Sequence, residues 1–428
     1  MDVRFQEAVK VAVAMVRPKA VVVLGGGAAG MIAAWRAALQ GCSVTLLEAN
    51  GRLGMKLRIS GGGKCNVTHE ASVKELLAAF SKEQARFLRP AFHAFGSDAI
   101  RALLLQEGVE TYTRDNGRVF PLDRIGSAGE VVAALQRLLH RAGVQVRTGA
   151  RVAGLLGTAP CLEALTLEDG TWVRADAFVL AAGGASYPET GTRGELLGAL
   201  RNLGVAVHPW FPALAPVPLV VPRPDWEGVA LRNGVLQLRA GESGKRLAEF
   251  PGDVVFTRSG ISGPAALELS QDVERARRAG NAWLVYVLSP ASEEALDVEL
   301  VQLQQANPHL AVRTWLQRLL PERLVVSALG ELKLPENQRM KDLPRPARRA
   351  LVLLVKGFPL GEPRPVPLSR GEVAAGGICL DSVDSKSMAL KGWENLRVCG
   401  ELLDIDGPIG GYNLQAAFST GYAAGESI

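Results

Sequence analysis

The residues Val21-Val22-Val23-Leu24-Gly25-Gly26-Gly27-Ala28-Ala29-Gly30 are the strongest structural signal in the chain. An apolar, β-branched run enters glycines spaced G-x-G-x-x-G, and an Ala- and Leu-rich segment, 31–39, follows without a helix breaker. Strand, tight turn and helix in this order form the first unit of a dinucleotide-binding domain. In such a unit Gly25 permits the turn, Gly27 lets the backbone approach a pyrophosphate, and Gly30 lets the helix pack closely on the sheet.

Two further apolar segments support this interpretation. Residues 41–47 predict a second strand, and Glu48 follows it about 20 residues after the glycine motif, where an acid accepts hydrogen bonds from a ribose. Residues 177–182 predict a buried strand that ends in Gly183-Gly184, and small residues there let the backbone pass close to a cofactor. We therefore expect an α/β, Rossmann-like nucleotide-binding domain.

Composition indicates that this domain is split by an insert. Prolines are frequent from about residue 196, and strand-like and then helical segments run to about 356. An apolar, glycine-containing sequence like that of the N-terminal part resumes at 372–378. A late glycine loop, 404–411, opens another helix and brings a second helix N-terminus to the same cofactor. The predicted parts are 1–195, an inserted domain at 196–370, and 371–428.

Bulk composition excludes several classes of protein. The net charge of +5 is scattered among mixed signs, so a nucleic-acid track is not expected. Five cysteines without a C-x-x-C pair and five isolated histidines predict neither a redox dithiol nor a metal site. No apolar run reaches the ~18 residues that span a bilayer. We expect a cytoplasmic protein that does not contact membranes, with a short helical extension at residues 1–18.

A third glycine-rich loop follows the ribose acid. Ser60-Gly61-Gly62-Gly63-Lys64-Cys65-Asn66, preceded by Arg58, predicts a backbone nest with positive neighbours. Such a nest suits a phosphate or the edge of a polar ring, although a flexible surface loop remains the alternative.

Taken together, these motifs resemble the bacterial YhiN-like, or BaiN-like, flavoproteins, which are FAD-dependent oxidoreductases also described as aminoacetone oxidase-like. The resemblance covers nearly the whole chain, and its most specific parts are residues 60–66 and Asp-Gly-Pro-Ile-Gly-Gly-Tyr-Asn-Leu-Gln at 406–415. It implies a split Rossmann-like FAD domain with an inserted barrel-like β and helical part. Lys64 stands where the family usually has Arg, which keeps the charge but loses a bidentate phosphate contact. Residues 192–195 also depart from the family's pattern, so we do not carry the family's substrate over to this chain.

The resemblance also implies how the cofactor is held. Lys56 and residues 61–66 would lie along the phosphates and ribityl chain, Glu401 on the ribityl hydroxyls, and Val152 near the adenine. Residues 410–413 would donate N–H groups toward the pyrimidine end of the isoalloxazine. The expected FAD-binding residues are Gly25, Gly27, Ala28, Ala29, Gly30, Glu48, Ala49, Asn50, Arg52, Lys56, Gly61, Gly62, Gly63, Cys65, Asn66, Val152, Ala182, Gly183, Gly184, Gly400, Glu401, Asp406, Gly410, Gly411, Tyr412 and Asn413.

The catalytic side chain is less clearly marked. Tyr187, Tyr412 and Cys65 are candidates near the expected ring, and the alternatives are packed aromatic side chains and a small buried thiol. Because residues 196–356 hold no second G-x-G-x-x-G, NAD(P)H would have to dock directly on the flavin. We expect hydride transfer between FAD and a small organic substrate, with oxygen-linked amine oxidation and RNA modification as alternatives.

Overall fold

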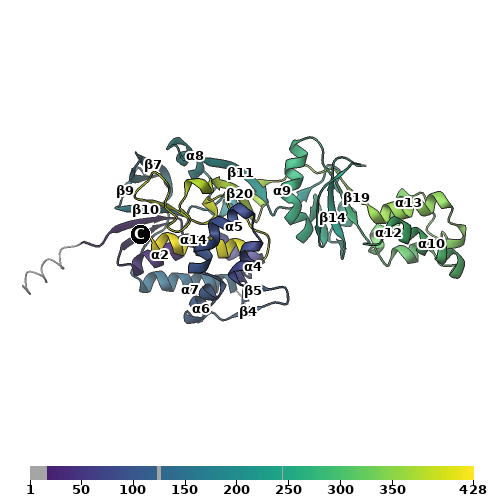
Figure 1. The fold of residues 1–428 in the computed structure, drawn as a ribbon, viewed down its shortest axis with the longest axis horizontal. Helices are drawn as coiled ribbons and strands as arrows, with labels where there is room; N and C mark the ends of the chain where they lie inside the picture. The colour runs from purple at the N-terminus through teal and green to yellow at the C-terminus, as the bar shows by residue number, and fades with distance from the viewer. Residues whose placement is uncertain (1–16, 123–126, 243) are drawn as a thin grey trace, which may run out of the picture. The chain divides into compact units, whose positions relative to one another are not determined.

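The computed structural model describes residues 17–122, 127–242 and 244–428 and is drawn in Figure 1. Most of the expected N-terminal extension therefore lies outside the described residues. Contacts divide the chain into two compact units, Met1–Phe211 with Val373–Ile428 and Pro212–Glu372, here called the Rossmann unit and the insert. Contacts thus assign residues 196–211 to the Rossmann unit, whereas the change in composition had placed the boundary at 195/196.

A five-stranded parallel sheet forms the centre of the Rossmann unit. The strand order is β21 (Leu396–Val398), β10 (Ala177–Leu180), β1 (Ala20–Leu24), β2 (Ser43–Leu47) and β6 (Gln145–Arg147). In β1, Val21 pairs with Ala177 on one side and Val44 on the other. The middle strands are buried throughout, which explains their continuous apolar sequence. The α/β, Rossmann-like fold class is thus confirmed.

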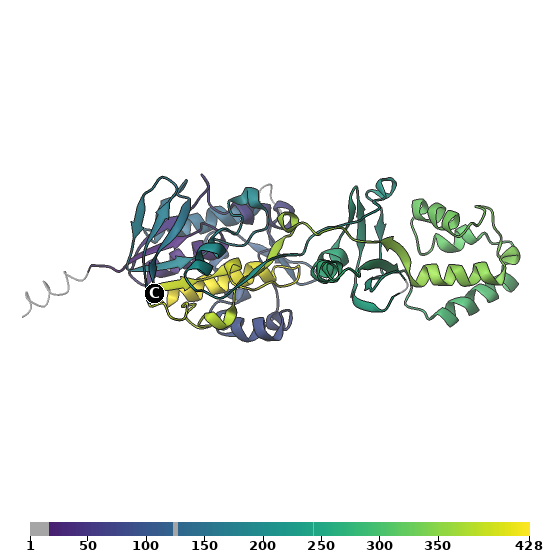
Figure 2. The ribbon, with the colours of Figure 1, turned by 90° about the horizontal axis from the view of Figure 1, so that it is seen from above.

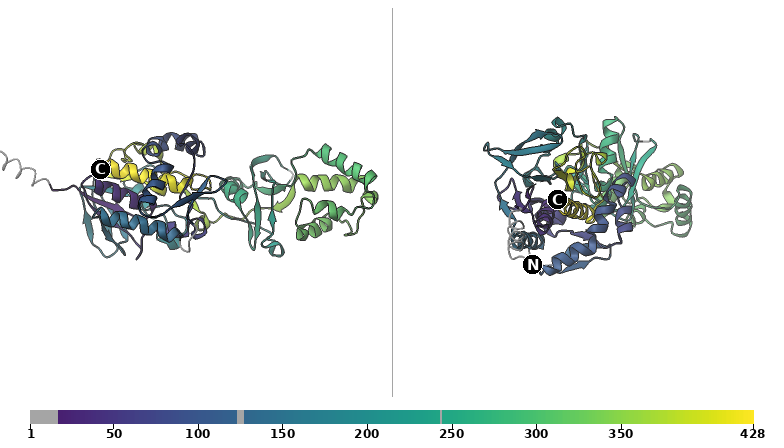
Figure 3. Two further views of the ribbon diagram at one scale, coloured as in Figure 1. Left: turned by 90° about the horizontal axis from the view of Figure 1, so that it is seen from below. Right: turned by 60° about the vertical axis from the view of Figure 1, so that its left-hand side comes forward.

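Helix α2 (Ala28–Leu39) packs on this sheet, and α7 (Ser127–Arg141) and α14 (Tyr412–Glu426) pack on α2. Helix α14, from the end of the chain, lies along α2, as the yellow and purple helices of Figures 1 and 3 show. Small residues make this possible, because an added Cβ at Gly421 would lie 2.3 Å from the Ala29 carbonyl oxygen. The two ends of the chain therefore build one domain around the insert.

Shorter elements complete the Rossmann unit. They are α3 (Met55–Ile59), β3 (Thr68–His69), α4 (Val73–Ala78), α5 (Lys82–Ala94), α6 (Ser97–Gln106), β4 (Thr111–Thr113), β5 (Arg118–Pro121), β7 (Val152–Thr158), β8 (Cys161–Leu167), β9 (Trp172–Arg174), α8 (Leu196–Asn202), β11 (Val207–Ala213) and β20 (Val373–Ile378). Strands β3, β5 and β4 form one small sheet, and β7, β8 and β9 another. Ser81 and Gln84 form a capping box at the start of α5, and Pro90 lies inside this helix.

The insert contains two four-stranded antiparallel sheets and its own core. The first sheet has the order β12 (Val217–Pro218), β17 (Gly260–Ser262), β16 (Val254–Thr257), β13 (Ala230–Leu231), and the second β15 (Arg246–Pro251), β14 (Val235–Arg239), β18 (Trp283–Val287), β19 (Phe358–Gly361). Helix α9 is Pro264–Arg278, and α10 (Glu293–Ala306), α11 (Val312–Leu316), α12 (Glu322–Glu331) and α13 (Arg345–Lys356) gather beyond the strands in Figure 2. Trp315, Tyr286 and Phe256 are among its fully buried side chains.

Across the described ranges, no helix is both long enough and apolar enough to span a membrane.

Candidate cofactor site

In the first glycine turn, two glycines are required by the fold and a third borders space for a ligand. Gly25 has φ +103°, and an added Cβ would lie 2.3 Å from the Ala181 carbonyl oxygen. At Gly30 the added Cβ would lie 1.8 Å from the Gly25 carbonyl oxygen, so only glycine lets α2 approach the turn. At Gly27 it would meet no atom within 4 Å. Gly27 therefore borders an open space at the N-terminus of α2, where the residues present fit a pyrophosphate.

Glu48 lies at the end of β2 and is 8% exposed. Its Oε2 accepts a hydrogen bond from the Gly26 N–H (2.8 Å), and its Oε1 accepts from the Asn50 N–H (2.8 Å) and from Asn50 Nδ2 (2.7 Å). A carboxylate offers about four acceptor positions, so these three bonds leave one for a ribose hydroxyl. Glu48 also fixes the glycine turn, a role that the sequence did not indicate.

The loop at residues 60–66 is a nest of left-handed backbone. Gly61, Gly62 and Gly63 have φ of +58°, +67° and +84°, a run that only glycine adopts without strain. Cys65 follows at φ +56° and is fully buried. Burial raises the pKa of its thiol to about 12, against a hydrogen bond with Ser60 that lowers it. Cys65 is therefore a neutral thiol at physiological pH, which argues against a nucleophilic role.

Lys56 and Glu401, expected at different parts of the cofactor, form an ion pair. Lys56 Nζ lies 2.9 Å and 2.7 Å from the two Glu401 carboxylate oxygens and also donates to Ser186 Oγ. Glu401 Oε1 accepts a further bond from the Ala374 N–H at 2.9 Å. The pair therefore holds together α3, the loop after β10, β20 and the turn after β21. Ser186 was missed by the sequence analysis, although it lies between two expected site residues, Gly184 and Tyr187.

The loop before α14 is held by side chains from several elements. The Asn413 amide bonds both the N–H and the carbonyl of Gly407, at 2.7 and 2.8 Å, so its side chain closes the loop. His69 lies with Nδ1 3.2 Å from the Gly410 carbonyl oxygen, and its ring stacks on Tyr412 with centroids 4.7 Å apart. Sequence reasoning missed His69, because nothing in its local pattern indicates that β3 contacts α14.

The structure places the remaining expected residues at several points of the Rossmann unit. Ala28 and Ala29 are in the first turn of α2; Ala49, Asn50 and Arg52 follow β2; Ala182, Gly183, Gly184 and Tyr187 follow β10; Gly400 follows β21; Val152 begins β7; and Asp406 accepts a bond from Gln84 Nε2. Because β1, β2, β10 and β21 are parallel, their carboxyl ends meet at one edge, where ligands of open α/β sheets bind.

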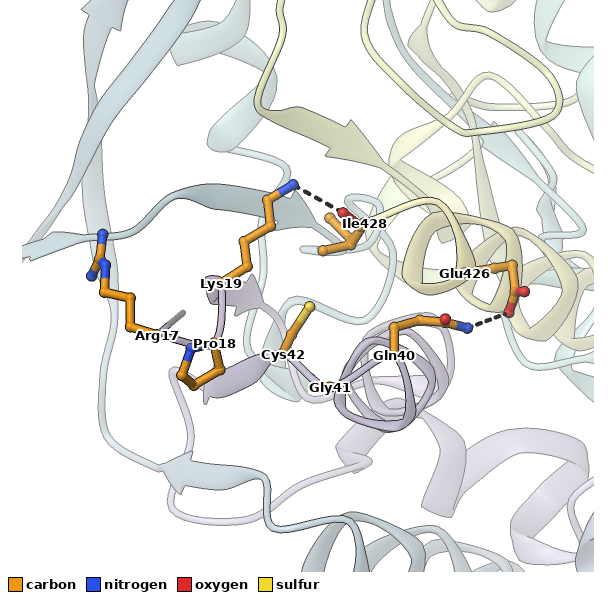
Figure 4. A pocket seen from close by; sticks show the side chains of 8 residues that line it. All are labelled: Arg17, Pro18, Lys19, Gln40, Gly41, Cys42, Glu426 and Ile428. Atoms are coloured by element: carbon orange, nitrogen blue, oxygen red, sulfur yellow. Dashed lines mark hydrogen bonds between the residues drawn. The ribbon is translucent and has the colours of Figure 1, made fainter. Parts of the chain in front are cut away.

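A separate pocket of about 510 Å³ lies where the strands begin (Figure 4). It is lined by Arg17, Pro18, Lys19, Gln40, Gly41, Cys42, Glu426 and Ile428. Lys19 Nζ donates to the Ile428 carbonyl oxygen at 2.9 Å, and Gln40 Nε2 to Glu426 Oε2 at 3.0 Å. Residues 17–19 and 40–42 lie just before β1 and β2, at the opposite ends of the strands from the glycine loops, and Glu426 and Ile428 lie at the end of the chain. None of the expected cofactor residues lines this pocket.

In the part of the chain that the structure describes, no group of three or more His, Cys, Asp or Glu residues is placed to hold a metal ion.

Comparison with known proteins places the whole chain in a family. The family model described as HI0933-like protein Rossmann domain matches residues 19–427. A 3-dehydro-bile acid delta(4,6)-reductase of Clostridium scindens is 28% identical over 419 residues, covering 95% of this chain and 98% of that protein. A ribosomal RNA dihydrouridine synthase of Haemophilus influenzae is 25% identical over 422 residues, with 95% and 98% covered.

Among solved structures, a 3-ketosteroid-delta4-(5alpha)-dehydrogenase of Rhodococcus jostii aligns with a TM-score of 0.51 and 17% identity, covering 96% of this chain and 99% of that one. At this identity the likeness concerns the fold alone. The family match confirms the resemblance that the motifs indicated, and the open cradle at Gly27 fits the cofactor that it implies. The chain therefore belongs to the HI0933-like Rossmann-domain family and is an FAD-dependent oxidoreductase.

Proposed function

We propose that this enzyme reduces a carbon–carbon double bond conjugated to a carbonyl group in a small organic molecule. The observation that carries the proposal is the match, over nearly their whole lengths, to two relatives with related names. A 3-dehydro-bile acid delta(4,6)-reductase and a dihydrouridine synthase are both named for the reduction of a ring double bond beside a carbonyl group. Their substrates differ greatly in size, so the shared bond type, rather than either molecule, is what we transfer to this chain.

FAD, when bound, supplies the hydride chemistry. The chain's own groups bind and orient it: the N-terminus of α2 and the open space beside Gly27 suit the pyrophosphate, and Glu48 suits the adenosine ribose. The N-terminus of α14, which begins at Tyr412, would place N–H groups beside the pyrimidine ring, where negative charge builds up on reduction.

Hydride addition to one carbon leaves the neighbouring carbon to be protonated. We assign this proton to the Tyr412 hydroxyl, because Tyr412 opens α14 and its ring is held in place by His69. Tyr412→Phe should retain FAD and lose turnover. Unchanged kinetics would remove Tyr412 from this role.

We further propose that NAD(P)H is the electron donor and docks directly on the flavin. The absence of a second G-x-G-x-x-G from residues 196–356 supports direct docking over a separate nucleotide domain. All five cysteines are free, and the structure describes each of them, which supports a reducing compartment such as the cytoplasm.

The test begins with the visible spectrum of the purified protein and anaerobic titration with NADH and NADPH. The reduced enzyme is then mixed, without oxygen, with cyclohexenone and with 4-androstene-3,17-dione. We expect reoxidation of the flavin and a product about two mass units heavier. Photochemically reduced enzyme tests the substrate separately from the donor. If amines reduce the flavin and only oxygen reoxidises it, the amine oxidase alternative would replace this proposal.

RNA modification is the second candidate, and one structural feature favours it. The segment 339–349 at the start of α13 carries Arg339, Lys341, Arg345, Arg348 and Arg349 against a single acid, Asp342. Of these cations Arg348 is paired, with Asp297 at 2.6 Å, and the described residues offer Lys341, Arg345 and Arg349 no ion-pair partner. Salt-sensitive binding of ribosomal RNA fragments, together with dihydrouridine formation by the reduced enzyme, would favour this candidate over a small molecule.

A further inference from the structure

Asn66 presents a buried hydrogen-bond acceptor that no described part of the chain satisfies. Its side-chain oxygen Oδ1 is inaccessible to solvent and has no donor. Other half-buried asparagines in the Rossmann unit are well bonded: Asn395 bonds the N–H and carbonyl of Leu162 at 2.9 and 2.8 Å, and Asn413 does the same with Gly407. A buried acceptor without a donor is costly, so its persistence points to a partner that the protein chain does not supply.

The backbone on both sides of Asn66 is held in place by hydrogen bonds. The Cys65 N–H donates to the Ser60 carbonyl at 3.0 Å, and the Val67 N–H donates to the Val119 carbonyl at 2.9 Å. Between them Cys65 adopts φ +56°, a conformation that non-glycine residues rarely take. Strain combined with an unsatisfied polar atom is typical of a preorganised ligand site.

The neighbours of Asn66 indicate which ligand this is. On one side lies the nest of Gly61–Gly63, and before it the Nε of Arg58 is also buried without a described partner. On the other side Thr68 abuts the loop before α14, because an added Cβ at Gly411 would lie 2.4 Å from its carbonyl oxygen. Asn66 therefore lies between the loop expected along the ribityl chain and the loop expected at the flavin ring.

We propose that Asn66 Oδ1 accepts a hydrogen bond from a ring N–H of the isoalloxazine and so positions the flavin for hydride transfer. The proposal rests on FAD being the cofactor. The ring offers N3–H in both oxidation states and N5–H only when reduced. An acceptor for N3–H strengthens binding of both forms equally, whereas an acceptor for N5–H favours the reduced form and raises the midpoint potential.

The experiment compares Asn66→Ala with Asn395→Ala, a matched control whose amide is satisfied at both ends. For each protein we would measure the apoprotein melting temperature, the dissociation constant of FAD and the midpoint potential. Asn66→Ala should not lower the apoprotein melting temperature, because it removes no bond and relieves an unsatisfied buried acceptor, and it should weaken binding of reduced FAD by about three- to tenfold. Asn395→Ala should melt earlier and keep the potential of the unsubstituted enzyme.

The size of the shift in midpoint potential identifies which ring N–H donates the hydrogen bond to Asn66. Each tenfold loss specific to the reduced form lowers the two-electron potential by about 30 mV and would identify N5–H. Equal losses in both forms would identify N3–H. If N3–H is the donor, Asn66→Asp, which keeps an acceptor, should also bind oxidised FAD more tightly than Asn66→Ala. The proposal is overturned if Asn66→Ala melts early with unchanged FAD affinity and potential, or if only the substrate KM rises. Unsubstituted protein that binds no FAD would overturn the cofactor assignment itself.

Discussion

Replacing Gly27 with Ala tests the cofactor cradle while leaving the fold intact. Gly27 has φ −82° and ψ −170°, which alanine adopts readily, and its added Cβ meets no atom within 4 Å. Alanine restricts the unfolded chain but is a poorer N-cap than glycine, and these effects oppose each other. We therefore expect the free energy of unfolding of the apoprotein to change by no more than about 0.5 kcal/mol.

The effect on FAD should be much larger. The added methyl group would occupy the space where a phosphate oxygen approaches the N–H groups of α2. Losing one hydrogen bond to a charged group costs about 1.5–3 kcal/mol, which corresponds to roughly 10- to 150-fold weaker binding. Urea unfolding of the apoprotein and fluorescence titration with FAD measure the two quantities separately.

Gly30→Ala is the contrasting control. Its added Cβ would lie 1.8 Å from the Gly25 carbonyl oxygen, so α2 must move away from the turn. Overpacking of this kind costs about 1–3 kcal/mol, partly offset by the better helix propensity of alanine. The apoprotein should therefore unfold earlier. The reasoning would be refuted if Gly27→Ala bound FAD as tightly as the unsubstituted protein, or if it destabilised the apoprotein as much as Gly30→Ala.

Three further predictions follow from other contacts. Because burial holds the pKa of Cys65 at about 12, iodoacetamide at pH 7.5 (about 4.5 units lower) should label exposed Cys161 and spare Cys65 in the native protein, as peptide mass spectrometry would report. Burial opposes the charge of Glu274, but bonds from two arginines and a backbone N–H lower its pKa from 4.5 to about 2, so it stabilises the insert above pH 4.5 and loses this effect as the pH falls toward 2. Glu274→Gln should cost about 3 kcal/mol in urea unfolding at pH 7 and little near pH 2. Lys56→Gln should cost about 1–2 kcal/mol, and adding Glu401→Gln should recover part of it in a double-mutant cycle.

The sequence predicts the central sheet well because its strands are buried on both faces. β1 and β10 are continuous apolar runs, and each is followed by the small residues that the sheet edge requires. The glycine turn is predicted equally well from the sequence. Glycine is required at positions 25 and 30 because an added Cβ would clash with backbone atoms that are close in sequence or on the paired strand. Steric constraints between residues that are close in the fold in this way produce a recognisable local sequence pattern.

Contacts between distant segments leave no such pattern. Lys56 and Glu401 are both recognisable as charged site residues, but each alone predicts a bond to the cofactor, and only the folded chain places them 2.7 Å apart. The stacking of His69 on Tyr412 is similar, because a two-residue strand carries too little periodicity to show its facing partner.

The arrangement also explains why the cofactor is easier to read from the chain than the substrate. Loops after β1, β2, β10 and β21 meet at one sheet edge, and each has glycine, alanine or an acid within its first two residues, as expected where the backbone itself approaches a nucleotide. Such positions tolerate few residue types. The sequence marks no comparable constraint for a substrate, because side-chain contacts with a small molecule can be made by many residue types. The glycine motifs therefore suffice to predict the flavin from the sequence. The double bond that the enzyme reduces must be identified by experiments with the flavin-loaded enzyme.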